Sequence, residues 1–281
     1  MLHQTFCHLA GIGPTTEQRL WDDGVHTWDD VLDGRARLPA RRLESMKRDL
    51  EESARCLGAR DAGRFATTLA AREHWRLFPE FRDGIAYLDI ETTGLSPGWD
   101  EITTVALYDG HRIRHYVRGI NLDQFERDIG DYRVLVTFNG KTFDVPFIEQ
   151  NLGIKLDQAH IDLRYVLKGL GYSGGLKSCE TQLGLRRDET VGIDGYLAAL
   201  LWSEYIASRN ERALETLLAY NIDDVLMLEQ LMVIAYNSKL RDTPFFERLI
   251  VADPRQPTNP CRVDRNLLEK VSRRWSSGMA Y

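Results

Sequence analysis

The chain has 281 residues and a net charge of −6, with 43% hydrophobic and 28% charged residues, which is an ordinary composition for a protein with a buried core. Its apolar runs are far shorter than the roughly 20 residues of a membrane helix, and residues 1–5 lack the pattern of a secretory signal. The acidic balance argues against a protein that coats nucleic acid non-specifically, but it excludes neither local phosphate contacts nor a carboxylate metal site. None of the four cysteines lies in a CxxC pair, and without an export signal we expect reduced thiols and a cytoplasmic location.

Residues 1–80 have apolar side chains at spacings of three and four, which predicts a small all-α N-terminal domain. From residue 84 the pattern changes to short apolar runs that predict strands, and later to alternation with helices. The predicted strands cover 85–90, 101–108, 112–118, 132–138 and 158–162, and the predicted helices cover 121–129, 143–152, 193–208 and 211–237. This order predicts an α/β domain over 84–237, with a mixed β-sheet flanked by helices. Prolines dominate the start of the C-terminal tail, 238–281, which holds one more predicted helix at 264–275.

The first strand of this domain ends in Asp89-Ile90-Glu91-Thr92-Thr93-Gly94. Residues two apart in a strand point to the same face, so Asp89 and Glu91 project together. Two neighbouring carboxylates repel each other unless a cation neutralises them, and their oxygens suit Mg²⁺ or Mn²⁺. The pair alone is a weak indication of a metal site.

Two later motifs add carboxylates, although each has an ordinary structural interpretation. Asp144 follows Phe138-Asn139-Gly140-Lys141-Thr142-Phe143 and begins a predicted helix, where an acidic residue is favoured in any case. Asp224 lies in a predicted helix four residues after Tyr220, so the two share a face, whereas Asp223 points about 100° away. A solvated aspartate pair would fit this last motif equally well.

Taken together, the three motifs resemble the DEDD 3′→5′ exonucleases. Tyr220 lies four residues before Asp224, and this spacing resembles that of the tyrosine subgroup, which includes the proofreading domains of family B DNA polymerases. The histidine subgroup has its histidine five residues before the aspartate, where this chain has Ala219. The closest resemblance is to bacterial RNase H-like domain proteins, and it covers roughly residues 84–237.

The resemblance implies an RNase H-like core and a metal-dependent 3′→5′ exonuclease that hydrolyses phosphodiester bonds, with DNA somewhat favoured over RNA. Asp89, Glu91, Asp144 and Asp224 would hold two Mg²⁺ or Mn²⁺ ions, and Tyr220 would orient the attacking water. Nucleic acid with a 3′ end is the implied partner, and proteins of DNA repair or replication are further candidates. A non-catalytic nucleic-acid-binding module and an RNase H-like endonuclease remain alternatives.

Several residues are candidates for contact with nucleic acid. Thr92 and Thr93 correspond to the family's first-motif loop, Asn139 lies in the second motif, and Lys177 is a candidate phosphate contact. In the N-terminal domain, Leu9-Ala10-Gly11-Ile12-Gly13-Pro14 resembles a helix-hairpin-helix element. In such elements the backbone N–H groups of a Gly-x-Gly turn face a phosphate, so Gly11 and Gly13 are the predicted contacts.

Overall fold

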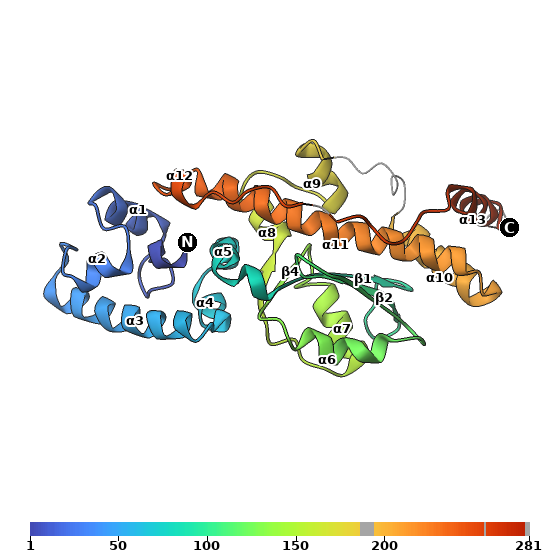
Figure 1. Cartoon of the computed structure of the whole chain (residues 1–281), viewed down its shortest axis with the longest axis horizontal. Coiled ribbons are helices and arrows are strands. Elements are labelled where there is room, and N and C mark those ends of the chain that lie inside the picture. The colour runs from blue at the N-terminus through green and yellow to red at the C-terminus, as the bar shows by residue number, and fades with distance from the viewer. Residues whose placement is uncertain (186–193, 256, 279–281) are drawn as a thin grey trace.

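The computed structural model describes residues 1–185, 194–255 and 257–278. Figure 1 shows the N-terminal helices at one end, the β-sheet in the middle and the last helix at the opposite end, with one long helix running along the molecule. The predicted start of a helix at Ile193 lies outside the described residues.

The sheet has five strands in the order β3-β2-β1-β4-β5. Strands β1, β2 and β3 are antiparallel neighbours, and β4 and β5 extend the sheet from β1 in parallel. The bounds are β1 Ile85–Thr92, β2 Ile102–Tyr108, β3 Ile113–Val117, β4 Val134–Thr137 and β5 Ala159–Asp162. This mixed sheet with helices on both sides confirms the predicted fold class.

Side chains that alternate along β1 contribute to two different hydrophobic core clusters, one on each side of the sheet. Ala86, Leu88 and Ile90 face a cluster with α6 (Phe125–Ile129) and α7 (Asp144–Leu152). Ile85 and Tyr87 face the larger cluster, which contains the long helix α11 (Glu211–Leu240). Since side chains alternate along a strand, Asp89 and Glu91 continue the row that faces α11.

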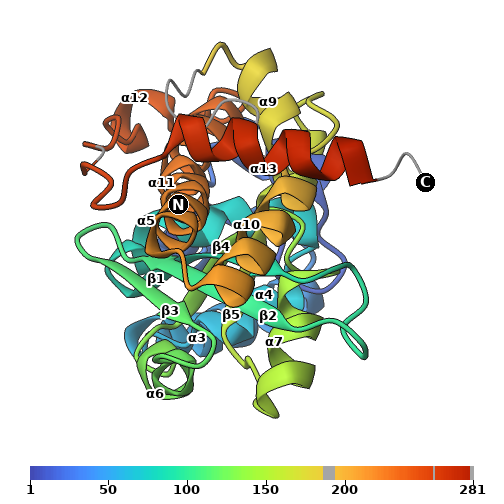
Figure 2. The same ribbon diagram turned by 90° about the vertical axis from the view of Figure 1, so that its right-hand side faces the viewer.

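The remaining helices of this part cover the same face as α11 or connect the strands. They are η4 Leu122–Gln124, α8 Leu163–Lys168, α9 Leu176–Gln182 and α10 Gly195–Ser208. Figure 2 shows α10 and α11 over one face of the sheet and α6 and α7 on the other.

The segment after residue 237 has more helix than the sequence indicated. Helix α11 continues to Leu240 and ends before Pro244, which cannot donate a helical hydrogen bond. The chain then forms α12 (Phe246–Leu249); residues 257–264 lie along α11 without helix or strand, and α13 (Arg265–Gly278) follows.

The N-terminal helices, residues 2–84, share the larger core cluster with the sheet and α11. Their bounds are η1 Leu2–Gln4, α1 Pro14–Asp22, α2 Trp28–Leu32, α3 Ala40–Gly58, α4 Ala62–Thr68, η2 Ala71–Leu77, α5 Phe78–Phe81 and η3 Arg82–Gly84. The ring of Trp75 lies 5.7 Å from that of Tyr236 on α11. An ion pair between Arg76 and Glu17, 2.8 Å apart and almost fully buried, joins η2 to α1. Within the described parts of the chain, no helix is both long and apolar enough to cross a membrane.

Candidate active site

Three carboxylates from two elements meet on the face of the sheet that α11 covers. Asp89 and Glu91 come from β1, and Asp224 comes from α11. Each offers an oxygen atom, and these oxygens lie within 4.8 Å of one another. Glu91 and Asp224 are buried, with exposed fractions of 7% and 5%. The structure therefore brings together residues that are separated by more than a hundred positions in the sequence.

Asp144, the fourth predicted carboxylate, lies beside this group of three but does not join it. It is the first residue of α7 and is buried. Its direction depends on the preceding turn, which Asp162 holds by accepting hydrogen bonds from the backbone N–H groups of Asn139 (2.8 Å) and Lys141 (3.1 Å). The backbone of Asn139 adopts a positive φ of 68°, a conformation that asparagine tolerates better than most residues.

The electrostatics of the site are those of crowded carboxylates. Burial, and then the charges of the other carboxylates, raise the pKa values of Asp89 and Glu91 well above their usual range. Burial also raises the pKa of Asp144 to about 7, with Asp162 and Asp224 acting in the same direction. A divalent cation would remove this repulsion, and buried carboxylate oxygens so close together are the donors that Mg²⁺ and Mn²⁺ prefer. The residues present therefore fit such an ion.

One important residue of the site was not predicted. The side chain of Asn221 is fully buried, donates to Asp89 Oδ2 over 2.7 Å and accepts from Thr104 Oγ1 over 3.0 Å. A signal for it was available, because Asn221 lies three residues before Asp224 and therefore shares its face of the helix. A polar side chain on the apolar side of a helix that bears a candidate ligand indicates a supporting role.

Tyr220 and Lys177 also lie at the site. Tyr220 is buried on α11, one turn before Asp224. Lys177, from α9, places its Nζ 4.5 Å from the centre of the Tyr220 ring. The charge of Lys177 also opposes the rise in the pKa of Glu91. One cation thus borders both the tyrosine and the acidic cluster.

A family model of the RNase H superfamily matches residues 86–236. The chain belongs to the RNase H superfamily. A search of curated proteins gives no match. Among solved structures, NrnC of Brucella melitensis is similar at 18% identity and a TM-score of 0.40, over 59% of this chain and 78% of that one. NrnC bound to pGG has 16% identity and a TM-score of 0.41, over 73% and 89% of the two chains. The family B DNA polymerase of Pyrobaculum calidifontis has 18% identity and a TM-score of 0.42 over 56% of this chain, which spans 24% of the polymerase.

The other predicted residues of the RNase H domain help to shape its loops. Thr92 is the last residue of β1, and its hydroxyl donates to Gly94 O over 2.5 Å. The backbone N–H of Thr93 donates to Glu101 O over 2.9 Å, so this amide is already engaged in the β1–β2 connection. The side chain of Asn139 accepts hydrogen bonds from Thr142 and Arg164.

Gly11 and Gly13 lie outside the RNase H domain, directly before α1, which Figure 1 shows among the N-terminal helices at one end of the molecule. Gly11 has a positive φ of 74°, and a Cβ atom at either glycine would have no neighbour within 4 Å. The turn is therefore open to solvent. The single turn η1 precedes it.

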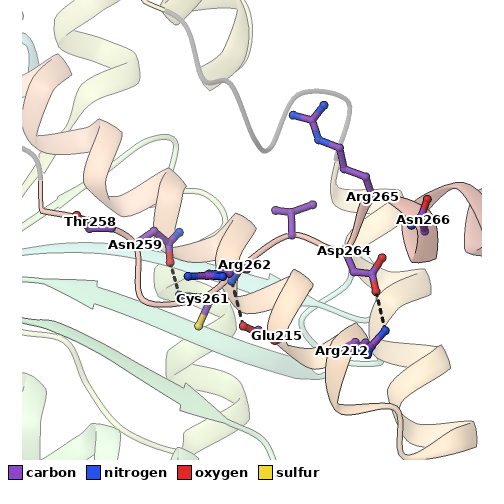
Figure 3. A pocket seen from close by; sticks show the side chains of 10 residues that line it. Arg212, Glu215, Thr258, Asn259, Cys261, Arg262, Asp264, Arg265 and Asn266 are labelled. Atoms are coloured by element: carbon purple, nitrogen blue, oxygen red, sulfur yellow. Dashed lines mark hydrogen bonds and ion pairs between the residues drawn. The ribbon is translucent and has the colours of Figure 1, made fainter.

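A pocket of about 750 Å³ lies between the start of α11 and the segment 258–266, but the carboxylates do not line it. Figure 3 shows Arg212 and Glu215 of α11 facing this segment, where Arg212 pairs with Asp264. Asn259 fastens the segment to α11 by donating to Ala219 O and to Asp223 Oδ1. Asp223 thus holds the C-terminal segment, whereas Asp224 belongs to the acidic cluster.

Proposed function

We propose that this chain is a metal-dependent nuclease that removes nucleotides from 3′ ends, with DNA favoured over RNA. The observation that carries the proposal is the buried cluster of Asp89, Glu91 and Asp224, with Asp144 beside it, in a domain of the RNase H superfamily. The direction of attack and the preference for DNA rest on the resemblance of the motifs, including Tyr220, to the proofreading exonucleases.

The four carboxylates would hold two Mg²⁺ or Mn²⁺ ions. When bound, such ions supply an activated water and neutralise the charge of the leaving oxygen. Asn221 engages one oxygen of Asp89 and so determines which oxygen is left for an ion. Tyr220 would orient the attacking water through its hydroxyl group.

Contacts to nucleic acid complete the proposal. Lys177 is the proposed phosphate contact at the site, because its ammonium group borders Tyr220. Thr92, Thr93 and Asn139 are proposed to shape the loops that receive the terminal nucleotide. In the N-terminal helices, the open turn with Gly11 and Gly13 is the proposed second phosphate site.

The test uses oligonucleotides labelled at the 3′ or the 5′ end, as single-stranded DNA, duplex DNA and RNA, with Mg²⁺ or Mn²⁺. We expect stepwise shortening from the 3′ end, and its loss in Asp89→Asn. Asp131→Asn, which changes an exposed aspartate in the same way, is the matched control and should cleave normally. Cleavage of closed circular DNA would instead identify an endonuclease, and binding without cleavage would identify a non-catalytic module.

A further inference from the structure

Trp99 stands apart from the other tryptophans whose side chains the structure describes. Its side chain is 93% exposed, whereas Trp21, Trp28, Trp75 and Trp202 are at most 6% exposed. Trp99 lies in the connection 93–101, which leaves β1 directly after Glu91 and Thr92 and is closed by the pairing of Thr92 with Ile102. The most exposed indole that the structure describes is therefore carried by the continuation of the strand that holds two carboxylates.

The 93–101 connection has a defined shape. The backbone N–H groups of Trp99 and Asp100 donate to Ser96 O over 3.0 and 2.8 Å. The Asp100 carboxylate accepts from Ser96 N over 2.9 Å. Gly94 allows the close approach of this carboxylate, because a Cβ at position 94 would lie 2.5 Å from it. Trp99 is thus presented to solvent by a hydrogen-bonded turn.

The connection is also tied to the helix that begins with Asp144. Asn151, on the last turn of α7, donates to Pro97 O (3.2 Å) and Asp100 O (3.3 Å) and accepts from Ile102 N (2.9 Å). Movement of this backbone relative to β1 or α7 would break these bonds. The backbone that carries Trp99 consequently has a defined place relative to the two elements that bear Asp89, Glu91 and Asp144.

We propose that Trp99 is a stacking platform for a base of single-stranded nucleic acid whose backbone lies at the carboxylate cluster; this rests on the proposed function and specifies its substrate. An unpaired base offers a flat face, and aromatic side chains bind it with little regard to sequence. In this connection only Leu95, 82% exposed, accompanies Trp99 as an exposed large apolar side chain. Two side chains are far fewer than the 20 to 30 residues a side that stable protein interfaces use, so a base is the better match.

The test measures binding, without metal and with a chelator present, by fluorescence anisotropy of a labelled thymidine oligonucleotide. The full chain carrying Asp89→Asn is compared with the same chain carrying Trp99→Ala or Trp99→Phe in addition. We expect Trp99→Ala to weaken binding by about 10-fold and Trp99→Phe to retain most of the affinity. An abasic oligonucleotide of equal length should bind equally to all three chains.

Ile250→Ala is the matched control, since it removes another exposed apolar side chain (51%), directly after α12 and beyond the C-terminal end of α11, and it should leave binding unchanged. Unaltered melting temperatures will show that the variants fold. Equal affinity of Trp99→Ala and its parent for the thymidine oligonucleotide, or an equal loss for the abasic one, overturns the stacking role. If binding depends on Trp99 but the unmodified chain cleaves no substrate, only the proposed nuclease activity is refuted. If the unmodified chain cleaves but oligonucleotide binding does not depend on Trp99, only the stacking role is refuted.

Discussion

At the scale of single residues, a neutral side chain, that of Asn221, engages one carboxylate of the acidic cluster. The side-chain amide of Asn221 is fully buried, donates a hydrogen bond to Asp89 and accepts one from Thr104. Removing this amide would leave polar atoms of Asp89 and Thr104 without the hydrogen bonds that it makes to them. Its role is therefore to position Asp89.

We expect Asn221→Ala to weaken Mg²⁺ binding and activity by about 10- to 100-fold, because partners that orient metal ligands typically contribute this much. It should also lower the free energy of unfolding by about 1–3 kcal/mol. Calorimetric titration with Mg²⁺ separates the two effects. Asn237→Ala is the control, because Asn237 lies on the same helix and its amide bonds the backbone of Val251. It should cost stability and leave the Mg²⁺ affinity unchanged; an equal loss of affinity in both variants would reject the positioning role.

Removing one charge from the cluster should have opposite effects with and without metal. Burial and repulsion raise the pKa of Glu91, so its ionised form destabilises the metal-free fold near pH 7. Glu91→Gln should therefore raise the melting temperature of the metal-free protein and abolish further stabilisation by Mg²⁺. Thermal melts with Mg²⁺ and with a chelator measure both effects. Glu101→Gln, at an exposed glutamate, should change neither; a lower melting temperature for metal-free Glu91→Gln would contradict the account.

At the scale of elements, the turn between β4 and α7 determines where Asp144 points. Gly140 packs against Thr137, and its N–H donates to the Thr137 hydroxyl over 3.1 Å. A Cβ at position 140 would lie 2.3 Å from that hydroxyl oxygen and 2.6 Å from Thr137 Cβ, which is too close without movement of the turn.

We expect Gly140→Ala to destabilise the protein by about 1–3 kcal/mol. Because displacement of a catalytic group by about 1 Å can cost about 100-fold in rate, activity should fall by about that factor. Denaturant unfolding and initial cleavage rates are the measurements. Gly175→Ala, at a glycine before α9 whose Cβ would meet nothing within 4 Å, should be nearly neutral. Full activity of Gly140→Ala would show that the turn tolerates the shift.

The elements and the acidic motifs were predictable because their signals are local. Alternation along 85–91 places Asp89 and Glu91 on one face, and a spacing of four places Tyr220 with Asp224. The position of Asn221 between Asp89 and Thr104 was not predictable in the same way, because it depends on how α11 crosses β1 and β2. The same reason applies to the position of the 93–101 connection, because its Pro97 carbonyl accepts a hydrogen bond from Asn151 of another element.

At the scale of the whole molecule, buried histidines connect stability to pH. The His8 ring contacts the rings of Trp28 and Phe65, with ring centres 5.4 and 5.7 Å away, and its Nε2 is 2.9 Å from Ser53 Oγ. Burial lowers its pKa from 6.5 to about 4. Burial lowers the pKa of His160 in the same way, to about 3. Both side chains are therefore neutral in the folded protein at pH 7.

Because the unfolded chain binds a proton at His8 more readily than the folded protein does, stability is lost as the pH falls from about 6.5 to about 4. His8 alone should account for about 2–3 kcal/mol of this loss. His8→Gln keeps a polar partner for Ser53 and cannot be charged, so its free energy of unfolding should depend less on pH across this range. Urea unfolding at several pH values measures the difference. Parallel pH profiles for the two proteins would show that His8 does not contribute.

The shared core of the N-terminal helices and the RNase H domain has a consequence for how the chain comes apart. The family model of the RNase H superfamily covers residues 86–236. The N-terminal helices nevertheless pack on residues at and beyond the end of this range, because Trp75 contacts Tyr236 and Trp21 contacts Phe245. A protease that cuts at the exposed residues Arg82 and Asp83 would sever one covalent connection and leave these contacts intact. The two fragments should then co-elute under native conditions and separate only in denaturant, because the shared core holds them together across the cut.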